Sequence, residues 1–199
     1  EFTGLPLSTW APYLSRANSV KEMWPSQRIL GDAGLYKGIS SVVQMPTSAG
    51  KTRATELVLR AAFASGRTKL AIVVAPFRAL CQEIAGDLQR AFLADGFEVN
   101  QLPDAMQADS NAELAAWLAL DGDPMPHVVV LTPEKLLYLL RQEDSFVANV
   151  GLVVYDEGHQ FDSGKRGVTY ELLLTSIKRL LPSAAQTVLI SAVIKNSAQ

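Results

Sequence analysis

A run of small residues that ends in Gly-Lys-Thr, Met45–Thr52 (MPTSAGKT), lies between a short apolar stretch and a helical pattern. Backbone N–H groups of such a loop, together with the positive end of the helix dipole, can bind phosphate. Gly50 would let the backbone approach the phosphate, Lys51 would reach its terminal oxygens, and the Thr52 hydroxyl would bind Mg²⁺. The full pattern also requires a glycine where Met45 stands. The alternative is an ordinary strand-to-helix turn with an exposed lysine.

Two adjacent carboxylates, Asp156 and Glu157, follow the apolar stretch 150–155 (VGLVVY). In parallel α/β sheets, ligands bind beyond the carboxyl ends of the strands, so this pair should share an edge with the Gly-Lys-Thr loop. Asp156 would hold Mg²⁺ through water, and Glu157 would position and deprotonate an attacking water. The alternative is a solvated acidic turn.

The elements that would position these residues are short apolar stretches separated by helical patterns. Unbroken apolar runs are typical of strands buried on both faces, and they occur at 39–44, 69–75, 127–131, 150–155 and 187–190, with a weaker candidate at 97–101. Helical patterns begin at Thr52 and recur at about 78–94, 111–120, 133–142 and 169–181. This alternation predicts an α/β fold with a doubly wound, mostly parallel sheet over 39–199. Residues 1–38 are expected to form a lead-in that packs on one sheet edge.

Composition narrows the class of protein. Among 199 residues, 48% are hydrophobic and 19% charged, which is typical of a globular domain with a sizeable core. Cys81 is the only cysteine, which excludes an internal disulfide and a multi-cysteine zinc site. No apolar run is long enough to cross a bilayer and no leader is visible, so we expect no membrane partner and an intracellular, cytoplasmic location. Because the chain begins Glu-Phe without Met, we expect a fragment of a longer chain.

Together, MPTSAGKT and DEGH at 156–159 resemble the first RecA-like motor domain of a superfamily 2 DExH-box helicase, closest to the superkiller-like branch. Further segments are similar to motifs of that family and occur in the same order: WPSQ at 24–27, APFRAL at 75–80, TPEK at 132–135, RGVTYE at 166–171 and SAV at 191–193. The resemblance implies a P-loop NTPase domain that uses ATP and Mg²⁺. Met45 and Val193 depart from the family pattern, and Val193 puts strand separation in more doubt than ATP hydrolysis.

The resemblance also implies a role for each matching residue. Gln27 would read the adenine edge, and His159 would link the ATP site to the Ser-Ala-Val segment. The remaining roles fall into three sets: loop contacts to the nucleotide by Pro46, Thr47, Ser48 and Ala49; nucleic-acid backbone contacts by Pro76, Arg78, Thr132 and Pro133; and coupling of hydrolysis to strand movement by Ser191 and Ala192.

Simpler interpretations of several of these residues stay open. Arg78 and His159 could be ordinary exposed residues. His127 is interpreted as structural, Cys81 as a small buried side chain, and Trp24 as either a support for the adenine pocket or a core aromatic.

The function expected from sequence is the ATP-binding half of an ATP-dependent helicase or translocase acting on DNA or RNA. A second RecA-like domain of the same chain would supply an arginine finger, so we expect negligible ATPase from these 199 residues alone. One alternative is a nucleotide-gated clamp or remodelling ATPase that does not separate strands. Another is a small P-loop kinase, which would need an arginine-rich lid that is not evident. The net charge of −2 gives no support to nucleic-acid binding, although it permits local backbone contacts.

Overall fold

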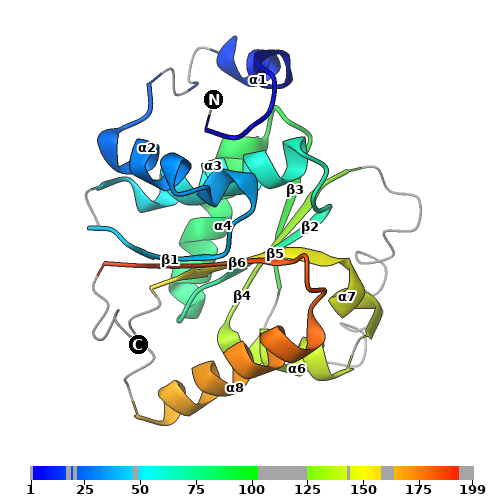
Figure 1. Cartoon of the computed structure of the whole chain (residues 1–199). Helices are drawn as coiled ribbons and strands as arrows, with labels where there is room; N and C mark the ends of the chain where they lie inside the picture. Colours follow the sequence, from blue (N-terminus) through cyan, green and yellow to red (C-terminus); the bar gives the residue numbers. More distant parts are fainter. Residues whose placement is uncertain are drawn as a thin grey trace.

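A single parallel sheet forms the centre of the molecule (Figure 1). The computed structural model describes residues 2–16, 19, 22–46, 49–102, 125–142, 144–157 and 164–192. In these ranges the sheet has six strands in the order β1-β6-β5-β2-β4-β3, and every neighbouring pair is parallel. The strands are β1 Ser41–Gln44, β2 Leu70–Val74, β3 Glu98–Gln101, β4 His127–Leu131, β5 Val150–Asp156 and β6 Gln186–Ser191. The α/β, doubly wound parallel fold predicted from the apolar stretches is confirmed.

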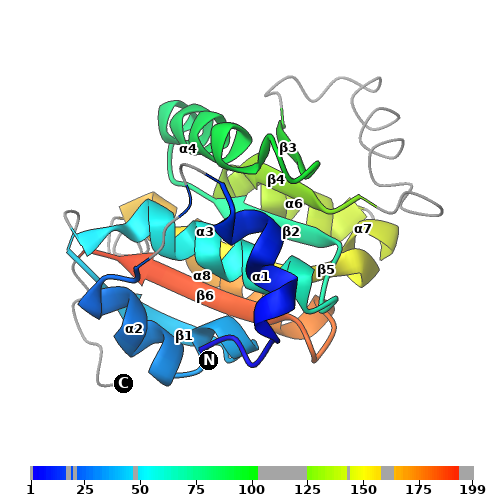
Figure 2. The same ribbon diagram turned by 90° about the horizontal axis from the view of Figure 1, so that it is seen from above.

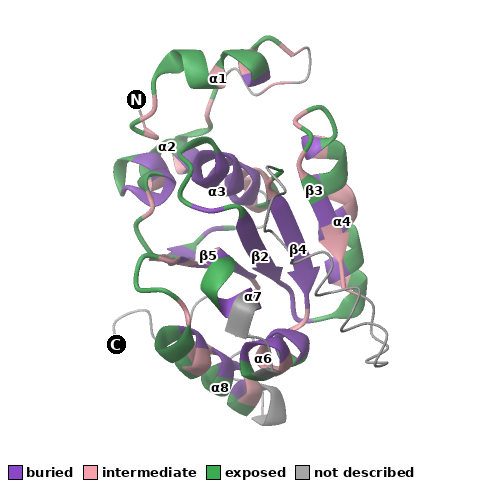
Figure 3. Ribbon diagram, turned by 90° about the vertical axis from the view of Figure 1, so that its right-hand side faces the viewer, coloured by how far each residue is buried: buried purple, intermediate pink, exposed green. Residues whose placement is uncertain are grey.

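Helices cover both faces of the sheet. One layer holds α3 (Lys51–Ala64) and α4 (Arg78–Phe92), and the opposite layer holds α6 (Pro133–Gln142), α7 (Asp144–Asn149) and α8 (Gly164–Leu180) (Figure 1). Successive strand residues point to opposite faces, so each central strand contributes to both cores. In β2, Ala71 and Val73 pack with α3 and α4, whereas Leu70, Ile72 and Val74 pack with the opposite layer. This two-sided burial explains the unbroken apolar runs of β2 and β4, whose residues are all buried (Figure 3).

One edge strand and two helices need comment against the elements expected from the sequence. The weak candidate at 97–101 is β3, an edge strand whose Val99 carbonyl accepts a hydrogen bond from Gln89 Nε2 at 3.0 Å. The short helix α7 was not predicted, and α8 begins earlier than the expected 169. The helix expected at 111–120 lies outside the described residues.

Two residues interpreted as structural are confirmed as such. His127 is buried at the start of β4, with Nδ1 at 3.3 Å from Glu98 Oε2. The buried Cys81 thiol donates to the Ala75 carbonyl at 3.7 Å.

The lead-in forms two helices, α1 (Leu7–Leu14) and α2 (Pro25–Asp32), and a 3₁₀ turn, η1 (Leu35–Lys37). Figure 1 and Figure 2 show α1 above the α3 layer and α2 beside α3, near the edge strand β1. Phe2, Trp10, Met23 and Leu30 pack against the α3-side core. The lead-in is joined to β6 by Gln186, whose Nε2 donates to the carbonyls of Leu35 in η1 and of Ile39 just before β1, at 2.8 and 3.0 Å.

A buried arginine on α3, Arg60, ties this lead-in to the domain. Its side chain is 5% exposed and donates to Glu56 Oε1 at 2.8 Å and to Asp95 Oδ2 at 2.6 Å. The guanidinium also lies over two aromatic rings, with its carbon 4.2 Å from the Tyr13 centroid and 4.7 Å from that of Phe92. Carboxylates and ring faces together compensate the cost of burying the charge.

Asp95 is the shared partner of two arginines. Arg16, just past α1, donates to both of its carboxylate oxygens, at 2.6 and 2.9 Å. Burial alone would raise the pKa of Asp95, but the hydrogen bonds from Arg16 and Arg60 outweigh burial and lower it. Asp95 therefore joins α1 to α3 through one ionised carboxylate.

We expect Asp95→Asn to lower the free energy of unfolding at neutral pH by about 1–3 kcal/mol, because buried charge-assisted hydrogen bonds are lost. A carboxylate with a lowered native pKa stabilises the fold above its unfolded pKa of about 3.9, and this stabilisation disappears as pH falls through the native value. Denaturant unfolding at several pH values should thus show the difference between Asp95→Asn and wild type shrinking below about pH 4. Asp87→Asn, which breaks the exposed pair with Arg90, is the control and should change stability by less than about 1 kcal/mol. A difference that persists unchanged into acid would contradict this assignment.

Candidate functional site

The carboxyl ends of β1, β6 and β5 lie level at one edge of the sheet. Gln44 is in register with Ser191, and Ile190 with Asp156. The ladder continues one residue past β1, where Met45 N–H donates to the Ser191 carbonyl at 2.8 Å. The loop after β1 and the acidic pair at the end of β5 therefore share one edge of the sheet, as predicted, and β6 lies between them.

Met45 occupies the place of the consensus glycine without strain. Its side chain is buried in the α3-side core, and its φ is negative. A residue with a negative φ and a side chain buried in a core has no need of glycine. The departure from the pattern thus reflects a packing position at the start of the loop.

Gly50, by contrast, must be glycine. It is the N-cap residue of α3 and has φ +86°, in the left-handed region that a side chain disfavours. A Cβ atom there would lie 3.2 Å from Gln27 Nε2 and 3.5 Å from Trp24 Cε3. Of the other loop positions, Pro46 is exposed and Ala49 half-buried, while Thr47 and Ser48 lie outside the described residues.

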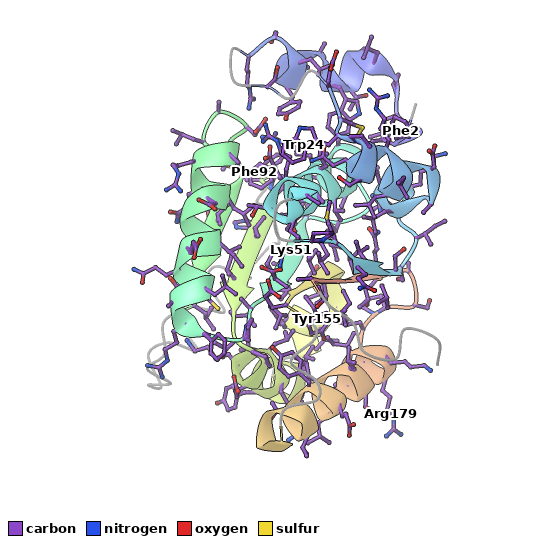
Figure 4. All side chains as sticks on the ribbon, turned by 90° about the vertical axis from the view of Figure 1, so that its left-hand side faces the viewer. Phe2, Trp24, Lys51, Phe92, Tyr155 and Arg179 are labelled. Atoms are coloured by element: carbon purple, nitrogen blue, oxygen red, sulfur yellow. The ribbon has the colours of Figure 1, made fainter. Side chains whose placement is uncertain are left out.

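Lys51, the first residue of α3, faces the acidic pair. Its Nζ donates to Glu157 Oε1 and lies 3.9 Å from Asp156 Oδ1. All three side chains are largely buried, with exposed fractions of 11–20%. In Figure 4, Lys51 lies on the α3 side of the sheet, above Tyr155, the residue before Asp156. The loop lysine and both carboxylates predicted from the sequence are brought together by the fold.

The backbone of the acidic pair is held in an uncommon conformation. Glu157 has φ +55°, the only positive φ of a non-glycine residue in the described ranges, and its N–H donates to Asp156 Oδ1 at 3.0 Å. Such a residue costs about 1–3 kcal/mol and persists where the surroundings determine it, often at functional sites. The turn directs the Glu157 side chain to Lys51.

Negative charge accumulates at this edge. Burial raises the pKa of Asp156, the positive charge of Lys51 opposes this rise, and the nearby carboxylates of Glu157 and Glu83 add to it. The cluster of Asp156, Glu157 and Glu83 carboxylates would be stabilised by a bound cation. Mg²⁺ is held in phosphate sites by one or two protein oxygens plus phosphates and waters. Asp156 and the exposed Thr52, in the first turn of α3, can supply those protein oxygens.

The segment before α2 contacts the loop directly. Gln27 is buried, its Oε1 accepts a hydrogen bond from Trp24 N–H at 3.0 Å, and Ser26 Oγ donates to the Ala49 carbonyl at 3.1 Å. Tyr36 supports this segment by donating from its hydroxyl to the Gln27 carbonyl at 3.2 Å. Trp24 is 54% exposed, so the core-aromatic interpretation was wrong. Sequence reasoning missed Ser26 and Tyr36, because only the three-dimensional contact identifies them.

The residues expected to hold a nucleic-acid backbone lie at the neighbouring strand ends. Ala75 N–H donates to the Leu131 carbonyl at 3.1 Å, which places the starts of α4 and α6 side by side. Arg78 is exposed and Thr132 half-buried, whereas Pro76 and Pro133 are buried and shape the two turns. Because Val74 is in register with both Leu131 and Tyr155, this pair of turns lies beside the acidic pair.

The coupling segment is described only in part. Ser191 is buried at the end of β6, where its carbonyl binds Met45, and Ala192 is half-buried. His159 and Val193 lie outside the described residues, as do 158–163 as a whole.

An α/β sheet with a Gly-Lys-Thr loop and an acidic pair at one edge defines a P-loop nucleoside-triphosphatase domain. Residues 24–199 match the family model for the DEAD/DEAH box helicase. The chain belongs to this family. Its superkiller-like branch stays a prediction.

Curated relatives include the Hachiman protein HamB of Bacillus cereus, 32% identical over 92% of this chain. The ATP-dependent DNA helicase Hel308 of Thermococcus kodakarensis is 28% identical over 97% of this chain. This chain spans 16% of the length of either relative.

Solved structures with the same fold include the DUF1998 helicase MrfA bound to DNA, with a TM-score of 0.73 and 19% identity over 96% of this chain and 27% of that one. The DEAD-box helicase Mss116 bound to ssRNA and UDP-BeF has a TM-score of 0.71 and 19% identity over 94% of this chain and 39% of that one. Within the described ranges, the helices are too short or too polar to cross a membrane.

Two buried tyrosines near the site differ in the partners of their hydroxyls. Burial raises the pKa of both Tyr36 and Tyr155. The Tyr36 hydroxyl donates to Gln27, whereas the Tyr155 hydroxyl has no hydrogen-bond partner in the described part of the chain.

We expect Tyr155→Phe to leave the free energy of unfolding unchanged or raise it by about 1 kcal/mol, because it removes a buried, unsatisfied polar group. Tyr36→Phe, the matched change, should lower it by about 1 kcal/mol, since the Gln27 carbonyl loses its donor. Thermal and urea unfolding compare the two variants directly. Equal destabilisation by both would contradict the assigned difference in hydrogen bonding.

Proposed function

We propose that this chain is the ATP-binding half of an ATP-dependent nucleic-acid helicase or translocase. The observation that carries the proposal is the contact of Lys51, at the end of a glycine-containing loop, with the Asp156–Glu157 pair at the end of β5. A cation and two carboxylates at a helix N-terminus suit a Mg²⁺-bound triphosphate. Membership of the DEAD/DEAH box family supports the same function.

In the proposed mechanism Lys51 exchanges partners. Its ammonium group binds Glu157 in this structure, and a terminal phosphate would compete with that carboxylate for the same charge. Lys51 would then neutralise phosphate charge, and the released Glu157 would orient and deprotonate the attacking water. Asp156 and Thr52 would hold Mg²⁺, which supplies further positive charge to the phosphates.

The base would lie on the α2 side of the loop. Gln27, proposed to read the adenine edge, sits beside Gly50 and is fixed by Trp24 N–H and by Tyr36. The exposed Trp24 indole lies against Gly50 and offers a flat apolar surface next to the proposed base.

Nucleic acid would cross the adjoining strand ends. The first turns of α4 and α6, with Arg78 and Thr132, would contact the phosphate backbone of DNA or RNA and so bind without reading sequence. His159, Ser191 and Ala192 would couple the two sites, and a second RecA-like domain of a longer chain would complete the ATP site. Because Val193 replaces the family's threonine, a remodelling ATPase that does not separate strands is the second candidate.

Two single substitutions test the roles proposed at the ATP site. Lys51→Ala should greatly weaken binding of Mg-ATP, because it removes the charge-assisted contact to phosphate. Glu157→Gln should keep binding and tighten it by up to about tenfold, about 1.4 kcal/mol, because the amide competes less for Lys51. Titration with a fluorescent ATP analogue measures both, and Glu134→Gln, an exposed acid on α6, is the control. Equal loss of affinity in the Lys51 and Glu157 variants would mean that the division of roles is wrong.

The nucleic-acid contact is tested by its salt dependence. Sequence-indifferent binding that weakens with added salt is expected. Arg78→Ala should reduce the slope of log affinity against log salt by about one unit, as for the loss of one phosphate contact. Arg90→Ala, an exposed arginine in the last turn of the same helix, should leave the slope unchanged. An unchanged slope in Arg78→Ala would make Arg78 an ordinary surface residue.

A further inference from the structure

The N-cap position of α4 is occupied by a partly exposed aromatic residue, Phe77, whose side chain does not cap the helix. Phe77 follows β2 and precedes Arg78, and 43% of its side chain is exposed. N-cap positions favour Ser, Thr, Asp or Asn, whose side chains bind the first-turn N–H groups. The phenyl ring cannot do this, and because Phe77 is 43% exposed, part of the benefit of burying an aromatic ring is also lost.

Among the described residues, the exposed aromatic rings lie near the carboxyl ends of the strands. In the described part of the chain, only Trp24 and Phe77 are exposed aromatic residues. Trp24 lies against Gly50 of the phosphate loop, and Phe77 lies where the ends of β2 and β4 meet. Exposed aliphatic side chains, by contrast, are scattered over the surface, as on most proteins.

The surroundings of Phe77 suit a single nucleic-acid strand better than an apolar protein surface. Arg78, its neighbour, is exposed, and Thr132 lies at the adjoining turn because Ala75 N–H binds the Leu131 carbonyl. A charged residue, a helix N-terminus and a flat ring within one turn combine phosphate contact with a stacking platform. Every base has a π-face, so such a platform is indifferent to sequence.

We propose that Phe77 stacks on a base of single-stranded nucleic acid and thereby fixes the position of the strand whose backbone Arg78 contacts. This inference rests on the proposed nucleic-acid function and adds a base contact to its backbone contacts. The stacking interaction is non-ionic, so it contributes to affinity without contributing to the salt dependence. DNA and RNA share the π-face, and both are stacking partners.

The experiment measures fluorescence anisotropy of labelled single-stranded DNA and RNA of one sequence, and of an oligomer of the same length whose sugars carry no bases. Phe77→Ala should weaken binding of the base-containing strands about fivefold or more, the scale found for loss of one base–aromatic stack. The salt slope should stay that of wild type, unlike in Arg78→Ala. Phe77→Tyr should restore affinity, and Phe77→Leu should not. On the base-free oligomer, Phe77→Ala should bind like wild type.

The outcomes separate the two proposals. Absence of any binding by the wild-type chain would contradict the proposed function itself. Normal binding by wild type together with equal affinity of Phe77→Ala, or equal loss on base-containing and base-free strands, would overturn the stacking role alone. Because Phe77 is 43% exposed, its variants should still fold, and thermal unfolding of each variant checks this. Should Phe77→Ala unfold earlier, the difference in affinity between Phe77→Tyr and Phe77→Leu decides the stacking role instead, and equal affinities of those two variants would overturn it.

Discussion

The ion pair between Lys51 and Glu157 is the contact on which the rest of the site depends. It joins the beginning of α3, which follows β1, to the end of β5. In the sheet β1 and β5 are separated by a single strand, β6, so the segments that follow them lie close together. The level register of the parallel strands brings both segments to one edge, and the hydrogen bond from Met45 to Ser191 fixes where the loop leaves the sheet. A slip by one residue in either register would turn the strand side chains to the wrong face and break this meeting. The strand order and register that bury the apolar side chains therefore also bring Lys51 and Glu157 together.

Buried charged side chains form two clusters in this domain, one around Arg60 and Asp95 and one around Lys51, and the two clusters differ in how well their charges are balanced. Around Arg60 and Asp95 the arginines are matched with carboxylates and ring faces, and the outcome is a fixed connection of the lead-in to α3. At the strand ends, Lys51 meets two carboxylates with a third acidic residue nearby, so the local charge is left negative and favours an added cation. The charges around Arg60 and Asp95 are already paired with one another. The carboxylates beside Lys51 would be stabilised by Mg²⁺, and Lys51 by phosphate, and this is why we propose that the functional site lies there.

The sequence was sufficient for the strands, most helices and the identity of the charged site residues, because each depends on local pattern. Buried strands need unbroken apolar runs, and the Gly50-Lys51-Thr52 and Asp156-Glu157 groups follow such runs directly. It was insufficient where the cause is a distant contact. The left-handed backbone of Glu157, the bond from Ser26 to Ala49 and the burial of Met45 each depend on a partner far away in the chain. The exposure of Trp24 and of Phe77 likewise follows from which surfaces remain uncovered.

The central claim, that Lys51 exchanges Glu157 for phosphate, is tested most directly by a crystal structure of the chain with Mg²⁺ and a non-hydrolysable ATP analogue. We predict that the terminal phosphate occupies the loop, that Lys51 Nζ contacts it, and that the Glu157 carboxylate is released toward the water side of that phosphate. An analogue bound elsewhere, or bound in the loop with the Lys51–Glu157 pair intact, would contradict the account.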